Sequence, residues 1–214
     1  MSENHQKKRI VKHILALIAL LAIAPCAGAQ EDAAPGARKP VGFGIADGSG
    51  TTLGMKFMPP DEEGWSMERG GLSVTLKKDG ALPGEGQEIE AYMITPDSSG
   101  GSIQEQVDAV KNNIQTGLAG SRKFRLVTLD AQADPGNARC VRGHVLLEDR
   151  QPAPKVRNKG KKWSEQYFMS CGFSATTRMG FEIRYSQRYF DGNGDEQFSA
   201  KADRLLGSVV NENP

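Results

Sequence analysis

Asp191, Asn193 and Asp195 carry side-chain oxygens that alternate with glycines in the segment "FDGNGDEQF" near the C-terminus. Oxygen ligands alternate in this way at the start of a calcium-binding loop, which also needs glycine at its sixth position and glutamate at its twelfth. These two positions hold Glu196 and Ala202. The segment therefore lacks both the residue for the sharp turn and the carboxylate that completes the coordination.

A turn explains the same residues without a ligand. Gly192 and Gly194 can adopt dihedral angles that other residues rarely reach, and Asp195 can cap a following helix. We predict a turn here, with no metal and no cofactor.

His144, Cys140 and Cys171 are the other residues that could do chemistry. Cys140 and His144 lie four residues apart in a predicted strand, about 13 Å, which is too far for direct contact. With Cys171 they make three ligands whose spacing matches no strong zinc pattern. We predict a structural disulfide between Cys140 and Cys171, with catalysis or metal binding as the alternative. No "GxSxG" motif accompanies His144, the one histidine after residue 29.

A run of basic residues occupies the segment "APKVRNKGKK", residues 153–162, which contains no acidic residue. Prolines before it and a glycine within it predict an exposed loop between two strands. A solvated loop is the simplest interpretation, and contact with an anionic envelope component or an acidic partner is the functional one. The basic residues are Lys155, Arg157, Lys159, Lys161 and Lys162.

Basic side chains also alternate along two predicted strands. If these strands were neighbours, the side chains could form one face that binds a carboxylate or phosphate. The alternative is that acids on the same strands, Glu148, Glu165 and Glu182, form cross-strand ion pairs with them. The four residues of this predicted anion-binding face are Arg142, His144, Arg184 and Arg188.

The N-terminal 29 residues have the three parts of a secretory signal peptide. Four basic residues come first, an uncharged apolar run follows over residues 14–24, and "AGA" precedes Gln30 as a cleavage site. The apolar run is shorter than the roughly 20 residues that a membrane-spanning helix needs. An uncleaved anchor is one alternative. Lipidation at Cys26 is another, which Pro25 disfavours because a small residue is expected before the cysteine. We predict a periplasmic or secreted protein without a stable membrane span after cleavage.

Cleavage would change the composition of the chain. It removes four basic residues and Glu3 from the 27 basic and 26 acidic residues, which leaves a net charge of about −2. This near-neutral charge gives no indication of nucleic-acid binding. The segment "GFGIADGSG" lacks the residues of a nucleotide-binding loop, so no nucleotide cofactor is expected.

The remaining chain predicts a flexible tether over residues 30–53 and a single domain over residues 54–214. Strand-like runs start at Met55, and a helix follows Ser102, which forms a capping box with Glu105. Four strand-like runs come next, and an apolar stripe predicts a last helix beginning near Phe198. This order predicts an α+β fold with a mainly antiparallel sheet of about six or seven strands and two helices.

The order of these elements resembles that of the PsbP-like and DcrB-like domains. The resemblance covers most of the chain and includes "FMPPDEEGW" before a hairpin, a central amphipathic helix, an antiparallel meander and a terminal helix after "EIRYSQRYF". It implies an α/β/α sandwich in an exported accessory or binding protein. It carries no site motif, so it implies no functional residue.

These observations favour an exported, non-catalytic accessory or binding protein of the bacterial cell envelope. Two alternatives are a periplasmic enzyme whose acids are assembled only in the fold, and a membrane-anchored structural component of the envelope.

Overall fold

A computed structural model describes residues 39–46, 52–60, 62–95, 101–151, 160–173 and 179–212. These residues belong to one compact unit, Arg38–Pro214. The predicted signal peptide and Cys26 lie outside the described residues, as do residues 30–38 of the predicted tether.

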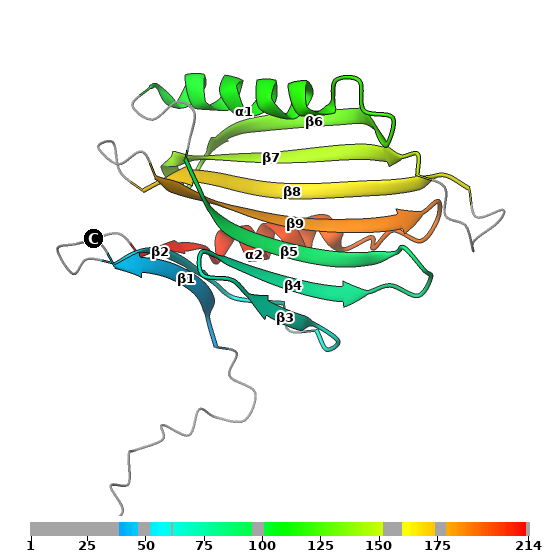
Figure 1. The fold of residues 1–214 in the computed structure, drawn as a ribbon, viewed down its shortest axis with the longest axis horizontal. Coiled ribbons are helices and arrows are strands. Elements are labelled where there is room, and N and C mark those ends of the chain that lie inside the picture. The colour runs from blue at the N-terminus through cyan, green and yellow to red at the C-terminus, as the bar shows by residue number, and fades with distance from the viewer. Residues whose placement is uncertain are drawn as a thin grey trace, which may run out of the picture. The chain divides into compact units, whose positions relative to one another are not determined.

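The described chain contains ten strands and two helices (Figure 1). In chain order they are β1 (Val41–Ala46), β2 (Thr52–Phe57), β3 (Ser66–Arg69), β4 (Ser73–Asp79), β5 (Gly86–Ile94), α1 (Ile103–Leu118), β6 (Phe124–Asp134), β7 (Asn137–Asp149), β8 (Lys162–Gly172), β9 (Gly180–Phe190), α2 (Phe198–Gly207) and β10 (Val210–Asn211).

Seven strands form one antiparallel sheet in the order β3-β4-β5-β9-β8-β7-β6 (Figure 1). All neighbours in this sheet pair antiparallel, and β9 lies at its centre between β5 and β8. The predicted α+β class with a mainly antiparallel sheet and two helices is confirmed.

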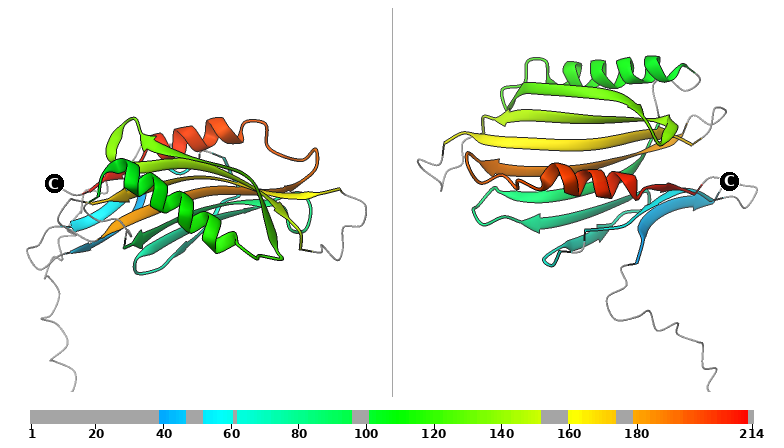
Figure 2. Two further views of the ribbon diagram at one scale, coloured as in Figure 1. Left: turned by 90° about the horizontal axis from the view of Figure 1, so that it is seen from above. Right: turned by 180° about the vertical axis from the view of Figure 1, so that it is seen from behind.

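Helix α2 covers one face of the sheet, as the rear view in Figure 2 shows. Because side chains alternate along a strand, Phe181, Ile183 and Tyr185 of β9 all point to this face. They are fully buried with Phe198 and Leu206 of α2 in the larger hydrophobic core. Burial of these side chains stabilises the fold and anchors the short helix.

Helix α1 packs on the opposite face, against β6 and β7 (Figure 2). Its predicted capping box is confirmed: Glu105 N–H donates to Ser102 Oγ at 3.2 Å, and Ser102 N–H donates to Glu105 Oε2 at 2.6 Å. Val107 is the only fully buried residue of this helix, and Val110 and Ile114 are half-buried. The apolar stripe of α1 is therefore only partly covered by the sheet.

A smaller sheet in the order β1-β2-β10 packs against the larger core. The prediction of a tether up to residue 53 was wrong for residues 41–46, which form β1, and for residues 52 and 53, which begin β2. Val41 is buried there, and Phe43 and Ile45 pack against the same core. Glycines between these residues make the segment look like a linker, although its apolar residues alternate as in a strand.

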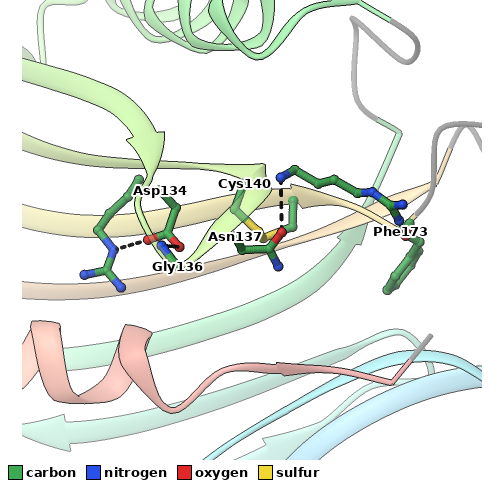
Figure 3. Close-up of a disulfide and its surroundings, with 8 residues drawn as sticks. Asp134, Gly136, Asn137, Cys140 and Phe173 are labelled. Atoms are coloured by element: carbon green, nitrogen blue, oxygen red, sulfur yellow. Dashed lines mark hydrogen bonds and ion pairs between the residues drawn. A yellow bond between two sulfur atoms is a disulfide. The ribbon is translucent and has the colours of Figure 1, made fainter. Parts of the chain in front are cut away.

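The predicted disulfide between Cys140 and Cys171 is confirmed. The two residues are directly opposite each other in β7 and β8, with their Cα atoms 4.2 Å apart. Figure 3 shows the bond beside the β6–β7 turn, where Asp134 Oδ2 accepts the Gly136 N–H at 3.1 Å. The cross-link joins two adjacent strands in the half of the sheet that lies next to α1.

Gly143 of β7 leaves the space that the Phe168 ring on β8 fills. A Cβ atom built at Gly143 would lie 2.3 Å from Cζ of Phe168 and 2.6 Å from the carbonyl oxygen of Asp130. The backbone oxygen cannot move without disturbing the pairing of β6 with β7. A side chain at this position would therefore displace Phe168, which is buried under α1.

We expect Gly143→Ala to lower the free energy of unfolding by about 1–3 kcal/mol through overpacking, measured by urea denaturation. Gly172→Ala is the matched control, because a Cβ atom at this β8 glycine meets nothing within 4 Å. Equal stability of the two variants would contradict the packing role of Gly143.

We expect the double change Cys140→Ala and Cys171→Ala to destabilise the protein by roughly 3–4 kcal/mol, because the disulfide lowers the conformational entropy of the unfolded chain. The residues are 31 positions apart. Denaturation of the oxidised protein with and without reductant should show a similar difference. Two titratable thiols in the untreated native protein would rule out the bond.

Candidate ligand-binding groove

A groove of about 520 Å³ lies between α1 and the uncovered part of the sheet face that α1 occupies. We call it the α1 groove. It exists because α1 packs on β6 and β7, while neither described helix lies above the same face of β8, β9 and β5. Residues from α1 and from five strands beside and beneath it, β5 to β9, line the space.

One wall and the floor of the α1 groove are apolar. The half-buried stripe of α1 forms the wall, and buried side chains of β7 and β8 form the floor. This side of the groove consists of Val110, Ile114, Leu118, Phe124, Val141, Val145, Leu147 and Phe168.

The other wall is polar and comes from β5, β8 and β9. Glu182 Oε1 accepts a hydrogen bond of 2.7 Å from the Tyr92 hydroxyl and another from Arg184 Nε. The Arg184 guanidinium also lies 5.7 Å from the centre of the Tyr92 ring. Gln166 and Ser170 of β8 complete this wall.

The electrostatics of the wall keep its protons in place. Burial and the Glu182 carboxylate raise the pKa of Tyr92, so its hydroxyl stays protonated and donates to Glu182. Burial lowers the pKa of Arg184, but the neighbouring Glu182 carboxylate outweighs this effect and the net pKa is raised. The Arg184 guanidinium therefore keeps its charge beside Glu182, and the Tyr92 phenol stays neutral near neutral pH.

The predicted anion-binding face is not formed, because its four residues lie on opposite faces of the sheet. Arg142 is opposite Met169 in the register, whereas Arg184 is opposite Phe168. Neighbouring residues of β8 point to opposite faces, so Arg142 and His144 share the face of α2 while Arg184 and Arg188 share the face of α1. The register needed to predict this is not visible in the sequence.

The alternative interpretation, that acids pair with these basic residues, agrees with the structure. Arg142 Nε lies 3.0 Å from Asp134 Oδ1, and His144 Nε2 lies 3.0 Å from Glu165 Oε1. The His144 ring also stacks on Tyr167, with 4.4 Å between ring centres. Because Cys140 is in the disulfide, it cannot act with His144 as a nucleophile or metal ligand.

Only the end of the predicted basic loop lies within the described residues. Lys155, Arg157 and Lys159 lie outside them, so a contact of these residues with an anionic partner remains a prediction. Lys162 begins β8 and forms an ion pair with the buried Asp149 at 3.1 Å. Asp149 therefore neutralises the charge of Lys162, which lies in a strand and not in the exposed basic loop predicted for residues 153–162.

Side chains of the 191–195 segment bond to other parts of the protein. Asp191 accepts hydrogen bonds from Trp163 Nε1 and from the Lys161 N–H, and both lower its pKa. Asn193 Nδ2 donates to Glu85 Oε1 at 2.8 Å. Among the described residues, no group of three or more acidic, histidine or cysteine side chains could hold a metal ion.

Two details of this predicted turn were wrong. Gly192 has the expected positive φ of 82°, but Gly194 does not, and a Cβ atom at Gly194 would lie 2.9 Å from the Tyr189 ring. Gly194 is therefore needed for close packing. The N-cap of α2 is Gln197, and Asp195 instead accepts the Gln197 N–H at 2.9 Å.

Sequence reasoning missed the α1 groove as a site. Arg184 and Glu182 were considered only as a basic residue and its ion-pair partner, and Tyr92 and Gln166 were not considered. The residues of the polar wall come from strands far apart in the sequence. Only the alternation of polar residues on β9 could have indicated this wall.

The chain matches no model of a known protein family and no curated protein. In the described part of the chain, neither helix has the length and apolar character needed to cross a membrane.

Lys201 of α2 joins two carboxylates beside the turn. Its Nζ lies 2.6 Å from Asp195 Oδ2 and 2.5 Å from Glu62 Oε1, and Lys78 Nζ lies 2.8 Å from Glu62 Oε2. The hydrogen bond from Lys201, followed by that from Lys78, lowers the pKa of Glu62. Burial raises the pKa of Asp195, but hydrogen bonds from Lys201 and the Gln197 N–H give a net lowering.

We expect Lys201→Gln to reduce stability at neutral pH and to flatten its dependence on acid pH. Carboxylates with lowered folded-state pKa values contribute stability that is present above their unfolded-state pKa of about 4 and lost as pH falls through the folded values. Urea unfolding at several pH values from neutral to about 2 measures both effects.

Lys77→Gln is the control, because exposed Lys77 also lies near two carboxylates, Glu68 at 3.3 Å and Glu88 at 3.8 Å. If the two variants change the acid dependence equally, the Lys201 network has no special role.

Proposed function

We propose that this chain is an exported, non-catalytic binding protein of the bacterial cell envelope, and that it holds a small amphipathic molecule in the α1 groove. The observation that carries the proposal is the pairing of an apolar wall and a polar wall across one groove. Small-molecule sites commonly combine a mainly apolar lining with a few polar groups in a volume of roughly 300–1,000 Å³.

A binding role is supported by the chemistry of the polar wall. Arg184 and Tyr92 both have raised pKa values, so neither exchanges a proton readily near neutral pH. Both side chains bond to Glu182, which fixes them as recognition groups.

Export is supported by the signal-peptide pattern of residues 1–29 and by the disulfide. A buried disulfide between two strands is compatible with an oxidising compartment such as the periplasm. The resemblance of the element order to PsbP-like and DcrB-like domains points in the same direction, since those domains occur in exported accessory proteins.

Gly117 offers a way to block the α1 groove without disturbing the core. It lines the groove, and a Cβ atom at this position meets nothing within 4 Å. Leucine there would occupy the groove and would also favour the helix, because glycine is a poor helix former. Gly207 in α2 is an equally open helical glycine outside the groove and provides the matched control.

We expect the uncharged fluorescent probe N-phenyl-1-naphthylamine to bind the unmodified domain. Gly117→Leu should weaken binding about tenfold or more, as expected for a ligand displaced from an apolar site, while Gly207→Leu leaves it unchanged. Fluorescence titration measures the affinity. Absence of binding, or equal binding by all three proteins, would refute the groove as the binding site.

A further inference from the structure

We infer that the α1 groove selects amphiphiles that join an alkyl chain to an uncharged head group rich in hydroxyl or amide groups, as in an alkyl glycoside. This inference rests on the proposed binding function and adds the class of ligand. It follows from the charge balance of the polar wall, from its donors and acceptors, and from the composition of the apolar wall.

The charges of the groove cancel. Among the described lining residues, Glu182 and Arg184 are the only charged ones, and they form an ion pair. An anionic head group near Arg184 would also face Glu182, and Glu90 lies opposite Arg184 in the register. A cationic head group near Glu182 would face the Arg184 guanidinium. Either charged head group therefore meets repulsion, whereas a neutral one does not.

The polar wall nevertheless offers hydrogen bonds in both directions. Within the described chain, Glu182 Oε1 takes both internal bonds, which leaves Oε2 as an acceptor and the Arg184 Nη groups as donors. The Gln166 amide and the Ser170 hydroxyl line the same wall, and each can donate and accept. Hydroxyl and amide groups match this mixture, because they also donate and accept.

The apolar wall favours an alkyl chain over a peptide. Val110, Ile114 and Leu118 of α1 face Phe168 across the space and offer no hydrogen bonds. A peptide placed there would leave backbone N–H and C=O groups without partners, which is costly, whereas an alkyl chain has no such groups. The apolar wall extends along α1 for roughly 12 Å from Val110 to Leu118.

The test compares three amphiphiles with a twelve-carbon chain: dodecyl maltoside, laurate and dodecyltrimethylammonium. Each is titrated into the unmodified domain by calorimetry below its critical micelle concentration. We expect the maltoside to bind about tenfold more tightly than either charged amphiphile. This factor corresponds to the cost of leaving one charged group of the polar wall poorly paired.

Single changes should reverse the preference in opposite directions. Glu182→Gln leaves Arg184 as the only charge, so laurate should gain about tenfold, and Arg184→Gln leaves Glu182, so dodecyltrimethylammonium should gain by a similar factor. Arg188→Gln is the control, because exposed Arg188 lies on the same strand and face but does not line the groove. Circular dichroism and melting temperatures check that each variant is folded.

The inference is overturned if the unmodified domain binds laurate or dodecyltrimethylammonium as tightly as the maltoside, or binds none of them. Tighter binding of an uncharged peptide of alternating leucine and serine would overturn it as well. These outcomes can be distinguished from a failure of the proposed function. If N-phenyl-1-naphthylamine still binds and Gly117→Leu still blocks it, the groove is a binding site with a different ligand class.

Discussion

The alternation of side chains along β9 is the constraint on which the rest of the structure depends. Strand β9 lies at the centre of the large sheet and pairs with β5 and β8 over most of its length. Phe181, Ile183 and Tyr185 point to one face and are fully buried under α2 and the small sheet. The intervening Glu182 and Arg184 must then point to the other face. A shift of the register by one residue would turn the core side chains of β9 to the groove and its polar side chains to the core.

The α1 groove is a consequence of unequal cover on the two faces. The face with the larger core receives α2 and the three-stranded sheet. Of the described helices and strands outside the large sheet, only α1 packs on the opposite face, where it lies over β6 and β7. One helix cannot cover a seven-stranded sheet. The exposed part of this face is therefore polar on β5 and β9, and the apolar stripe of α1 is left partly open where it meets them.

The elements with strong periodicity could be predicted from the sequence, and the arrangement of their faces could not. Helix α1 was recognisable from its capping box, and the strands from Phe124 onward from their alternation. Strand β1 was missed because Gly42 and Gly44 hide the alternation of Val41, Phe43 and Ile45. Arg142 and Arg184 were assigned to one face wrongly, since which face each occupies depends on its position relative to β8. Predicting the α1 groove would require the same knowledge of which distant strands pair.

The position of β9 also bears on how the chain reaches its native state. Strand β5 can complete its pairing only with β9, and the pair Gly86 and Arg188 shows that these partners are about a hundred residues apart. Contacts between distant segments form late and slow the search for the native topology. A chain that crosses a membrane in extended form, N-terminus first, would hold an open half-sheet until residues 180–190 arrive. For an exported chain, as proposed above, a central strand that arrives late would delay closure of the large sheet and would keep the chain extended while it is translocated.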